Sequence, residues 1–168
     1  KKGKTELKKI LFVGSECMPF AATGGLGDVM GSLPAALKKA GGSGIDARVV
    51  MPLYDRIGND WRSRMQCEAV FEVYLGWRRQ YCGVHSLEKD GVKYYFIDNE
   101  YYFGRDYIYG VFNCDEAERF GFFSRAVLDL LPLLDEMPQV IHCNDWQTAL
   151  IPVFLEEFYR KEVVCCKD

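Results

Sequence analysis

The sequence predicts an α/β fold, a Rossmann-like α/β/α arrangement of layers around a mostly parallel sheet. A short unbroken apolar run at residues 10–13 is followed by a glycine-rich turn and then by a helical pattern. A second apolar run at residues 47–52 completes a strand–helix–strand unit, which joins parallel strands. Two polar clusters follow predicted strands, where open α/β sheets place their ligand sites.

The composition favours one domain with a sizeable core. The chain has 168 residues, of which 49% are hydrophobic. We expect residues 1–7 to form a flexible lead and residues 8–168 to form that domain. A net charge of −3 argues against nucleic acid and anionic membranes as partners. Seven cysteines without C-x-x-C spacing, and no apolar run near ~18 residues, predict a soluble protein in the reducing cytoplasm.

The helix after the first strand is indicated by apolar residues that recur at helical spacing from residue 29 to residue 37. Gly41 and Gly42 supply its stop signal, whereas Pro34 weakens the pattern because proline removes a helical hydrogen bond. Further along, residues 84–87 and 92–97 predict a hairpin about the turn at residues 89–91. We expect its second strand to rejoin the sheet.

The second half of the chain contains four expected elements. Residues 101–113 are crowded with Tyr, Phe and Gly and predict an ordered surface loop. A long helix should follow the acidic start at residues 115–116, and a short buried strand should cover residues 140–141. A last helix is expected over residues 147–160, with four residues facing inward: Leu150, Ile151, Phe154 and Phe158. Because the chain stops where a doubly wound sheet would add a strand, we expect a fragment of a longer protein.

The glycine-rich turn at residues 23–27 lies where a helix N-terminus can hold phosphate. A tight turn that needs positive φ is the alternative, and the glycine pattern does not separate the two. The turn lacks the G-x-G-x-x-G spacing and no Gly-Lys-Ser/Thr follows, which argues against a nicotinamide-binding domain and against a nucleoside triphosphatase. Asp28 either accepts hydrogen bonds from sugar hydroxyls or simply stabilises the first helical turn.

The second polar cluster contains His142, Asn144, Asp145 and Trp146, directly after the short strand. Each has a structural alternative: Asp145 as an N-cap, Trp146 as core packing and His142 as a satisfied half-buried residue. Both clusters fall at one predicted sheet edge, which favours a shared cleft. His85 and His142 do not stand at metal-ligand spacing, so we expect no zinc, and no motif indicates a covalent nucleophile.

Five motifs in sequence order resemble the N-terminal half of bacterial glycogen synthases and plant starch synthases. They are Ser15-Glu16-Cys17-Met18-Pro19-Phe20, Thr23-Gly24-Gly25-Leu26-Gly27-Asp28-Val29, Ser32-Leu33-Pro34, Val49-Val50-Met51-Pro52-Leu53-Tyr54 and His142-Cys143-Asn144-Asp145-Trp146-Gln147-Thr148. The resemblance implies the N-terminal domain of a GT-B glycosyltransferase, without its C-terminal domain. It further implies retaining transfer of glucose from ADP-glucose to the non-reducing end of an α-1,4-glucan, with no metal or other cofactor.

The same resemblance implies roles for individual residues. It assigns the active site to His142, Asn144, Asp145 and Asp115, and substrate binding to Thr23, Gly24, Gly25, Gly27 and Asp28. Ala22 stands at the position where the family has a donor-binding lysine. Either charges of the C-terminal domain replace that lysine, or donor binding is altered.

Three aromatic residues, Tyr54, Trp77 and Tyr107, are candidates for stacking on sugar rings, with core or surface packing as the alternative. We expect the 168 residues to fold but not to turn over without the partner domain. A non-catalytic glucan-binding module of the same fold is the alternative function.

Overall fold

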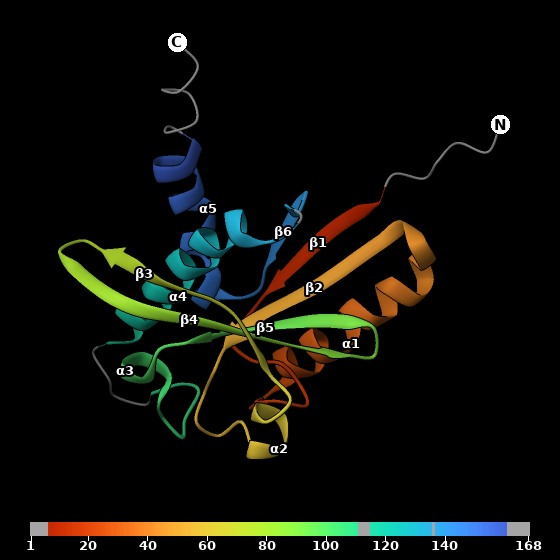
Figure 1. Ribbon diagram of the computed structural model, residues 1–168, viewed down its shortest axis with the longest axis horizontal. Coiled ribbons are helices and arrows are strands. Elements are labelled where there is room, and N and C mark those ends of the chain that lie inside the picture. The colour runs from red at the N-terminus through yellow and green to blue at the C-terminus, as the bar shows by residue number, and fades with distance from the viewer. Residues whose placement is uncertain (1–6, 111–114, 136, 161–168) are drawn as a thin grey trace, which may run out of the picture.

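The computed structural model describes residues 7–110, 115–135 and 137–160, which form one six-stranded sheet with helices on both faces (Figure 1). The strands are β1 Lys8–Val13, β2 Ile45–Pro52, β3 Gln66–Leu75, β4 Arg78–Lys89, β5 Val92–Asp98 and β6 Val140–Cys143. The helices are α1 Gly25–Gly41, α2 Asn59–Arg62, α3 Glu100–Phe103, α4 Glu116–Leu130 and α5 Leu150–Phe154. Short 3-10 turns lie at Gly42–Gly44, Leu131–Leu133 and Trp146–Thr148, and a π-helical turn at Leu155–Arg160.

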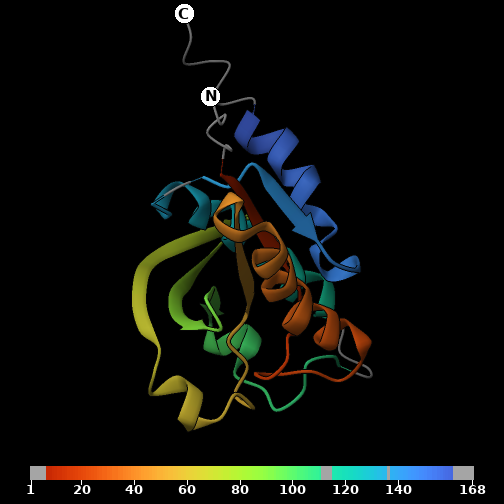
Figure 2. The same ribbon diagram turned by 90° about the vertical axis from the view of Figure 1, so that its right-hand side faces the viewer.

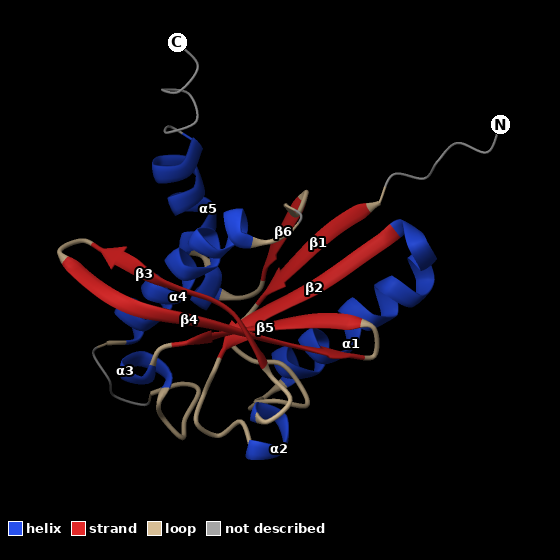
Figure 3. Ribbon diagram, in the orientation of Figure 1, coloured by secondary structure: helices blue, strands red, loops and turns tan. Residues whose placement is uncertain are grey.

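The sheet has the strand order β3-β4-β5-β2-β1-β6, and the four strands from β5 to β6 run parallel (Figure 3). Helix α1 covers one face, while α4 and α5 cover the other (Figures 1 and 2). The predicted α/β/α layering and the parallel crossover between the first two strands are therefore confirmed. The central strands are apolar because layers cover both of their faces.

Helix α1 runs through Pro34 without ending there. It ends where the sequence predicts, at Gly41, and Gly42 follows with a φ of 55°, which glycine adopts readily. The predicted hairpin is also confirmed. Asp90 and Gly91, with φ of 52° and 74°, form the two-residue turn between β4 and β5.

The antiparallel part of the sheet is larger than the sequence predicts. Strand β4 begins at Arg78 rather than near residue 84, and β3 pairs with it along nearly its whole length. Gly76, with a φ of 60°, and Trp77 form the turn between them. The pattern of β3 did not reveal this strand because its exposed face includes Val70 and Tyr74, so apolar and polar residues do not alternate.

The segment expected to be a surface loop, residues 101–113, is partly helical and partly buried. Tyr102 and Phe103 belong to α3 and are buried, as is Ile108. The fully buried guanidinium of Arg119 donates hydrogen bonds to the carbonyls of Tyr102 and Ile108, which fixes the segment against α4. Residues 111–113 of this prediction lie outside the described residues.

The long helix α4 forms as predicted, with its apolar stripe in the core. Strand β6 also forms, but it is not buried: it lies at an edge of the described sheet, and Val140 is largely exposed. The expected last helix is divided into a 3-10 turn, α5 and a π-helical turn. Of its four inward residues, Ile151 is buried, Phe154 is half-buried, and Leu150 and Phe158 are exposed.

Apart from Leu7, the expected flexible lead lies outside the described residues. The end of the predicted domain, beyond residue 160, also lies outside them. Within the described part, no helix is both long and apolar enough to span a bilayer.

Candidate active site

The two predicted polar clusters lie at the same end of the sheet, at the carboxyl ends of its strands, because β1 and β6 are neighbouring parallel strands. Phe12 pairs with His142 and Val13 with Cys143, so both strands end side by side (Figure 1). The amide of Asn144 continues this pairing by donating to the carbonyl of Val13 at 3.0 Å. The glycine-rich turn leaves β1, and the segment of residues 144–148 leaves β6, at the same edge.

The backbone of the glycine-rich turn is open and extended. Gly24, the N-cap of α1, has a φ of −162°, so the turn does not need the positive φ of the alternative interpretation. A Cβ added to Gly24 or Gly25 would meet nothing within 4 Å. No side chain caps the 17-residue helix, and the first helical amides, at Gly25 and Leu26, have no acceptor within it. These features favour the approach of an anion to the backbone.

Gly27 has a different role from the glycines before it. A Cβ added there would lie 2.3 Å from the Cβ of Ala22. The close packing of these two residues holds the start of α1 against the preceding loop. Asp28 is exposed in the first helical turn, where its carboxylate suits the helix dipole.

Glu16 organises the turn, although its motif did not indicate a role for it. This carboxylate is buried, and its Oε2 accepts hydrogen bonds from the amide of Thr23 at 2.5 Å, from the Thr23 hydroxyl at 3.1 Å and from the amide of Gly24 at 3.3 Å. Two turn amides are therefore already used, so a ligand would meet those of Gly25 and Leu26. The available signal was a single charged residue in the otherwise uncharged stretch of residues 14–27 after the first strand.

Tyr109 connects the turn with the segment before α4. Its hydroxyl donates to Oε1 of Glu16 at 2.9 Å and lies 2.8 Å from the Ser15 hydroxyl. The hydroxyl of the buried Tyr54 donates to the Ser15 carbonyl at 2.8 Å. Burial raises the pKa of both tyrosines, which keeps them protonated as donors at neutral pH. The sequence carried no signal for Tyr109, since its segment has no periodicity.

His142 and Asn144 lie at the end of β6. The exposed His142 ring contacts Phe12 edge-on, with centroids 4.9 Å apart. The side-chain amide of Asn144 donates to the carbonyls of Val13 and His142, each at 3.1 Å. These bonds position the segment, so the Oδ1 of Asn144 is the atom that remains suited to a sugar hydroxyl.

The N-cap interpretation of Asp145 is confirmed. Its Oδ1 accepts a 2.7 Å hydrogen bond from the amide of Trp146, at the start of the 3-10 turn Trp146–Thr148. Its φ of 65° is unusual for a residue with a side chain, and such backbone is typical of functional sites. The core-packing interpretation of Trp146 is wrong: the ring is 52% exposed and rests edge-on against Phe120 at 5.3 Å. Asp145, with its unusual backbone, and Trp146 are therefore both exposed to solvent.

Asp115 stands at the N-cap of α4 and forms a two-point ion pair with Arg105, at 3.2 and 2.5 Å. This pairing holds the pKa of Asp115 below its usual range, so the carboxylate is ionised at neutral pH. Within the described part, these bonds tie Asp115 to the segment that carries Tyr109 rather than directly to the glycine-rich turn. That Asp115 lines the same site stays a prediction.

The three aromatic candidates for stacking on sugar rings differ in their exposure to solvent. Tyr54 is wholly buried, so it cannot stack on a sugar. Trp77 is exposed in the turn between β3 and β4, where Arg78 lies over its ring at 5.1 Å. Tyr107 is partly exposed and accepts a hydrogen bond from Arg105.

Among the described residues, no three His, Cys, Asp or Glu side chains gather as metal ligands. The four described cysteines carry free thiols. Burial raises the pKa of Cys17, which precedes the turn, to about 12, and it also raises the pKa of Cys143 at the end of β6. Both thiols therefore stay protonated at neutral pH and are poor nucleophiles.

Comparison with known proteins shows which family this chain resembles. Residues 9–166 match the family described as the starch synthase catalytic domain. The glycogen synthase of Geobacillus stearothermophilus is 53% identical over 155 residues, which are 92% of this chain and 31% of that protein. The glycogen synthase of Clostridium botulinum (strain Eklund 17B / Type B) is 53% identical over 156 residues, 92% of this chain and 32% of that protein.

Among solved structures, the catalytic domain of Starch Synthase IV from Arabidopsis thaliana, bound to ADP and acarbose, matches with a TM-score of 0.80 and 30% identity. The match covers 94% of this chain and 31% of that one. The chain thus spans about a third of the length of the curated relatives it matches.

Proposed function

Because this chain belongs to the starch synthase catalytic domain family, we propose that it is the acceptor-side domain of a retaining GT-B glucosyltransferase. The complete enzyme would transfer glucose from ADP-glucose to the non-reducing end of an α-1,4-glucan. The observation that carries this proposal is the open backbone at Gly24 and Gly25, which lies beside the polar segment after β6 at one sheet edge. The relative solved with ADP supports a nucleotide-linked donor.

In this proposal the chain contributes electrostatic support rather than a nucleophile. The amides of Gly25 and Leu26, at the positive end of α1, would stabilise the charge that develops on the departing ADP. Asp28 and the Oδ1 of Asn144 would accept hydrogen bonds from sugar hydroxyls. His142, Asp145 and Asp115 would form the floor and wall of the cleft, and the partner domain would supply most nucleotide contacts.

The free thiols of the four described cysteines support a reducing, cytoplasmic setting for the enzyme. We propose that setting together with the activity.

The test is a chimera in which this chain replaces the matching 155 residues of the Geobacillus stearothermophilus glycogen synthase. We expect transfer of labelled glucose from ADP-glucose to glycogen by the chimera, and none by the 168 residues alone. Two variants of the chimera, His142→Ala and Asp145→Ala, test the candidate site, and both should transfer glucose more slowly than the parent chimera. A folded chimera that binds maltooligosaccharides but elongates nothing would favour the non-catalytic module, and robust transfer by the 168 residues alone would refute the division between domains.

A further inference from the structure

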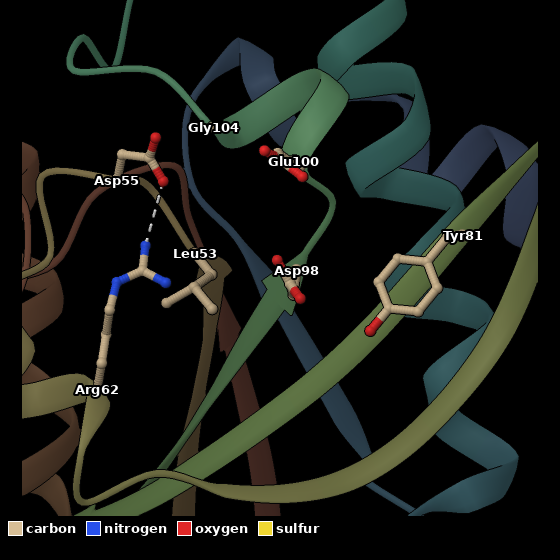
Figure 4. A pocket seen from close by; sticks show the side chains of 7 residues that line it. All are labelled: Leu53, Asp55, Arg62, Tyr81, Asp98, Glu100 and Gly104. Carbon is tan, nitrogen blue, oxygen red and sulfur yellow. Dashed lines mark ion pairs between the residues drawn. The ribbon is translucent and has the colours of Figure 1, made fainter.

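A hollow of about 290 Å³ lies at the carboxyl ends of β2 and β5, lined in part by Asp55, Arg62, Tyr81, Asp98 and Glu100 (Figure 4). None of these residues belongs to the candidate active site. The hollow opens at the same end of the sheet as the candidate active site, because β5, β2, β1 and β6 run parallel and their carboxyl ends lie together. Three inter-strand spacings separate β5 from β6, a distance of about 14 Å.

Two close backbone approaches build the wall of the hollow. A Cβ on Gly83 would lie 2.5 Å from the Tyr81 hydroxyl and 3.2 Å from Oδ2 of Asp98, so glycine lets the Tyr81 ring lie along the sheet toward Asp98. A Cβ on Gly104 would lie 2.5 Å from the carbonyl of Glu100, so glycine lets the chain turn closely past α3. The Tyr81 ring therefore has a fixed position beside Asp98, and the backbone that carries Glu100 is fixed by the turn at Gly104.

The charges of the hollow exclude an anionic ligand. Arg62 is its cation, and this guanidinium donates to the carbonyls of Tyr54 at 2.8 Å and Ile57 at 2.9 Å and pairs with Asp55 at 3.5 Å. With that charge neutralised, the remaining charged side chains of the lining are the carboxylates of Glu100 and of Asp98, whose Oδ2 lies 3.6 Å from Nε2 of His85. The described residues also contain no metal cluster that would reverse the local charge.

The remaining groups suit a neutral ligand with many hydroxyls. Asp98 and Glu100 offer carboxylate acceptors for hydroxyl donors, and such charge-assisted hydrogen bonds are strong. Tyr81 is 49% exposed and offers the face of its ring to an apolar C–H surface. We propose that this hollow binds glucose units of the acceptor α-glucan, away from the end that reacts; this inference rests on the proposed function.

A remote subsite of this kind predicts a dependence on chain length. A short glucan at the candidate active site would not reach across about 14 Å, whereas a long one would occupy both places. The hollow would therefore strengthen the binding of maltoheptaose and glycogen but leave the binding of maltose unchanged.

The experiment titrates maltoheptaose and maltose into this chain and into its Tyr81→Ala, Asp98→Ala and Gly83→Ala variants. Each variant should bind maltoheptaose about tenfold more weakly, the loss expected for one charge-assisted or stacking contact, with maltose unchanged. Tyr74→Ala is the matched control, since Tyr74 is a comparably exposed tyrosine on neighbouring β3, outside the hollow. Thermal unfolding of each variant verifies the fold, and Gly83→Ala displaces the Tyr81 ring without removing it.

Unchanged maltoheptaose binding in folded Tyr81→Ala and Asp98→Ala variants would overturn the inference, as would an equal loss in Tyr74→Ala. ADP binding that Arg62→Ala abolishes would also overturn it, because the hollow would then be an anion site. In the chimera, the variants should raise the KM for glycogen and leave the KM for ADP-glucose unchanged. A chimera without transfer, whose hollow variants still lose maltoheptaose binding, would refute the proposed function and leave this inference standing.

Discussion

Substitution by alanine is expected to change the stability of the fold in opposite directions at Gly25 and at Gly27, two glycines of the turn after β1. At Gly27 an added Cβ would lie 2.3 Å from the Cβ and 3.3 Å from the Cα of Ala22, atoms that cannot move without the backbone. At Gly25 the added Cβ would meet nothing within 4 Å. Gly27 therefore serves packing, whereas Gly25 leaves space for a ligand.

The stability changes follow from these distances. The clash at Gly27 involves atoms fixed to the backbone, so it should cost the upper part of the overpacking range, about 2–3 kcal/mol. Alanine recovers about 1 kcal/mol over glycine inside a helix, which leaves a net loss of about 1–2 kcal/mol for Gly27→Ala. Gly25→Ala should gain up to about 1 kcal/mol. For a chain of this size, 1 kcal/mol shifts Tm by about 2–4 °C, so the two variants should differ by roughly 2–12 °C.

The assays are urea unfolding of the chain for stability and calorimetric titration of the chimera with ADP for binding. Gly25→Ala should weaken ADP binding about tenfold or more, because a methyl group would hold a phosphate oxygen away from the helix amides. Unchanged ADP affinity in Gly25→Ala would show that the open turn is not the phosphate site. Equal stability of Gly27→Ala and the parent chain would refute the packing argument.

Three further results are expected. Glu16→Ala should cost about 2–3 kcal/mol in urea unfolding, since the amide and hydroxyl of Thr23 lose their acceptor, whereas Glu16→Gln keeps a carbonyl and should cost about 1 kcal/mol; equal costs would contradict the network. The pKa of Asp115 is lowered in the folded state, so its pair with Arg105 contributes stability above about pH 4 and loses it as the pH falls through the folded pKa. Asp115→Asn should therefore flatten the acid limb of a stability–pH curve by about 1 kcal/mol, and an unchanged slope would count against it. Ala22→Lys should lower the KM of the chimera for ADP-glucose about tenfold by adding a cation beside the donor phosphates, and an unchanged KM would mean that charges elsewhere suffice.

Local features of the fold were predictable because they depend on neighbouring residues. The apolar runs of β1 and β2, the Asp90-Gly91 turn and the stripe of α4 all form as expected. The exposure of β6 was not predictable, since Val140 belongs to an apolar run but lies at a sheet edge. Which strand lies at an edge depends on the order of the whole sheet.

The candidate site also has a part that the sequence predicted and a part that only the folded chain shows. The sequence placed both polar clusters at strand ends, and the parallel pairing of β1 with β6 brings those ends together. It did not reveal that Glu16 holds the turn or that Tyr109, 93 positions away, completes the hydrogen bonds. A buried carboxylate and its distant donor are joined only by the folded chain.

By itself, the sequence determined the α/β class, the glycine-rich turn, the polar segment after β6 and the family resemblance, because each is written in short runs of adjacent residues. Only the tertiary structure decided that Gly27 serves packing while Gly25 stays open, and that Tyr54 is buried. It also decided that Tyr81 and Asp98 border a hollow beside the site. These outcomes depend on distances between atoms that no local pattern specifies.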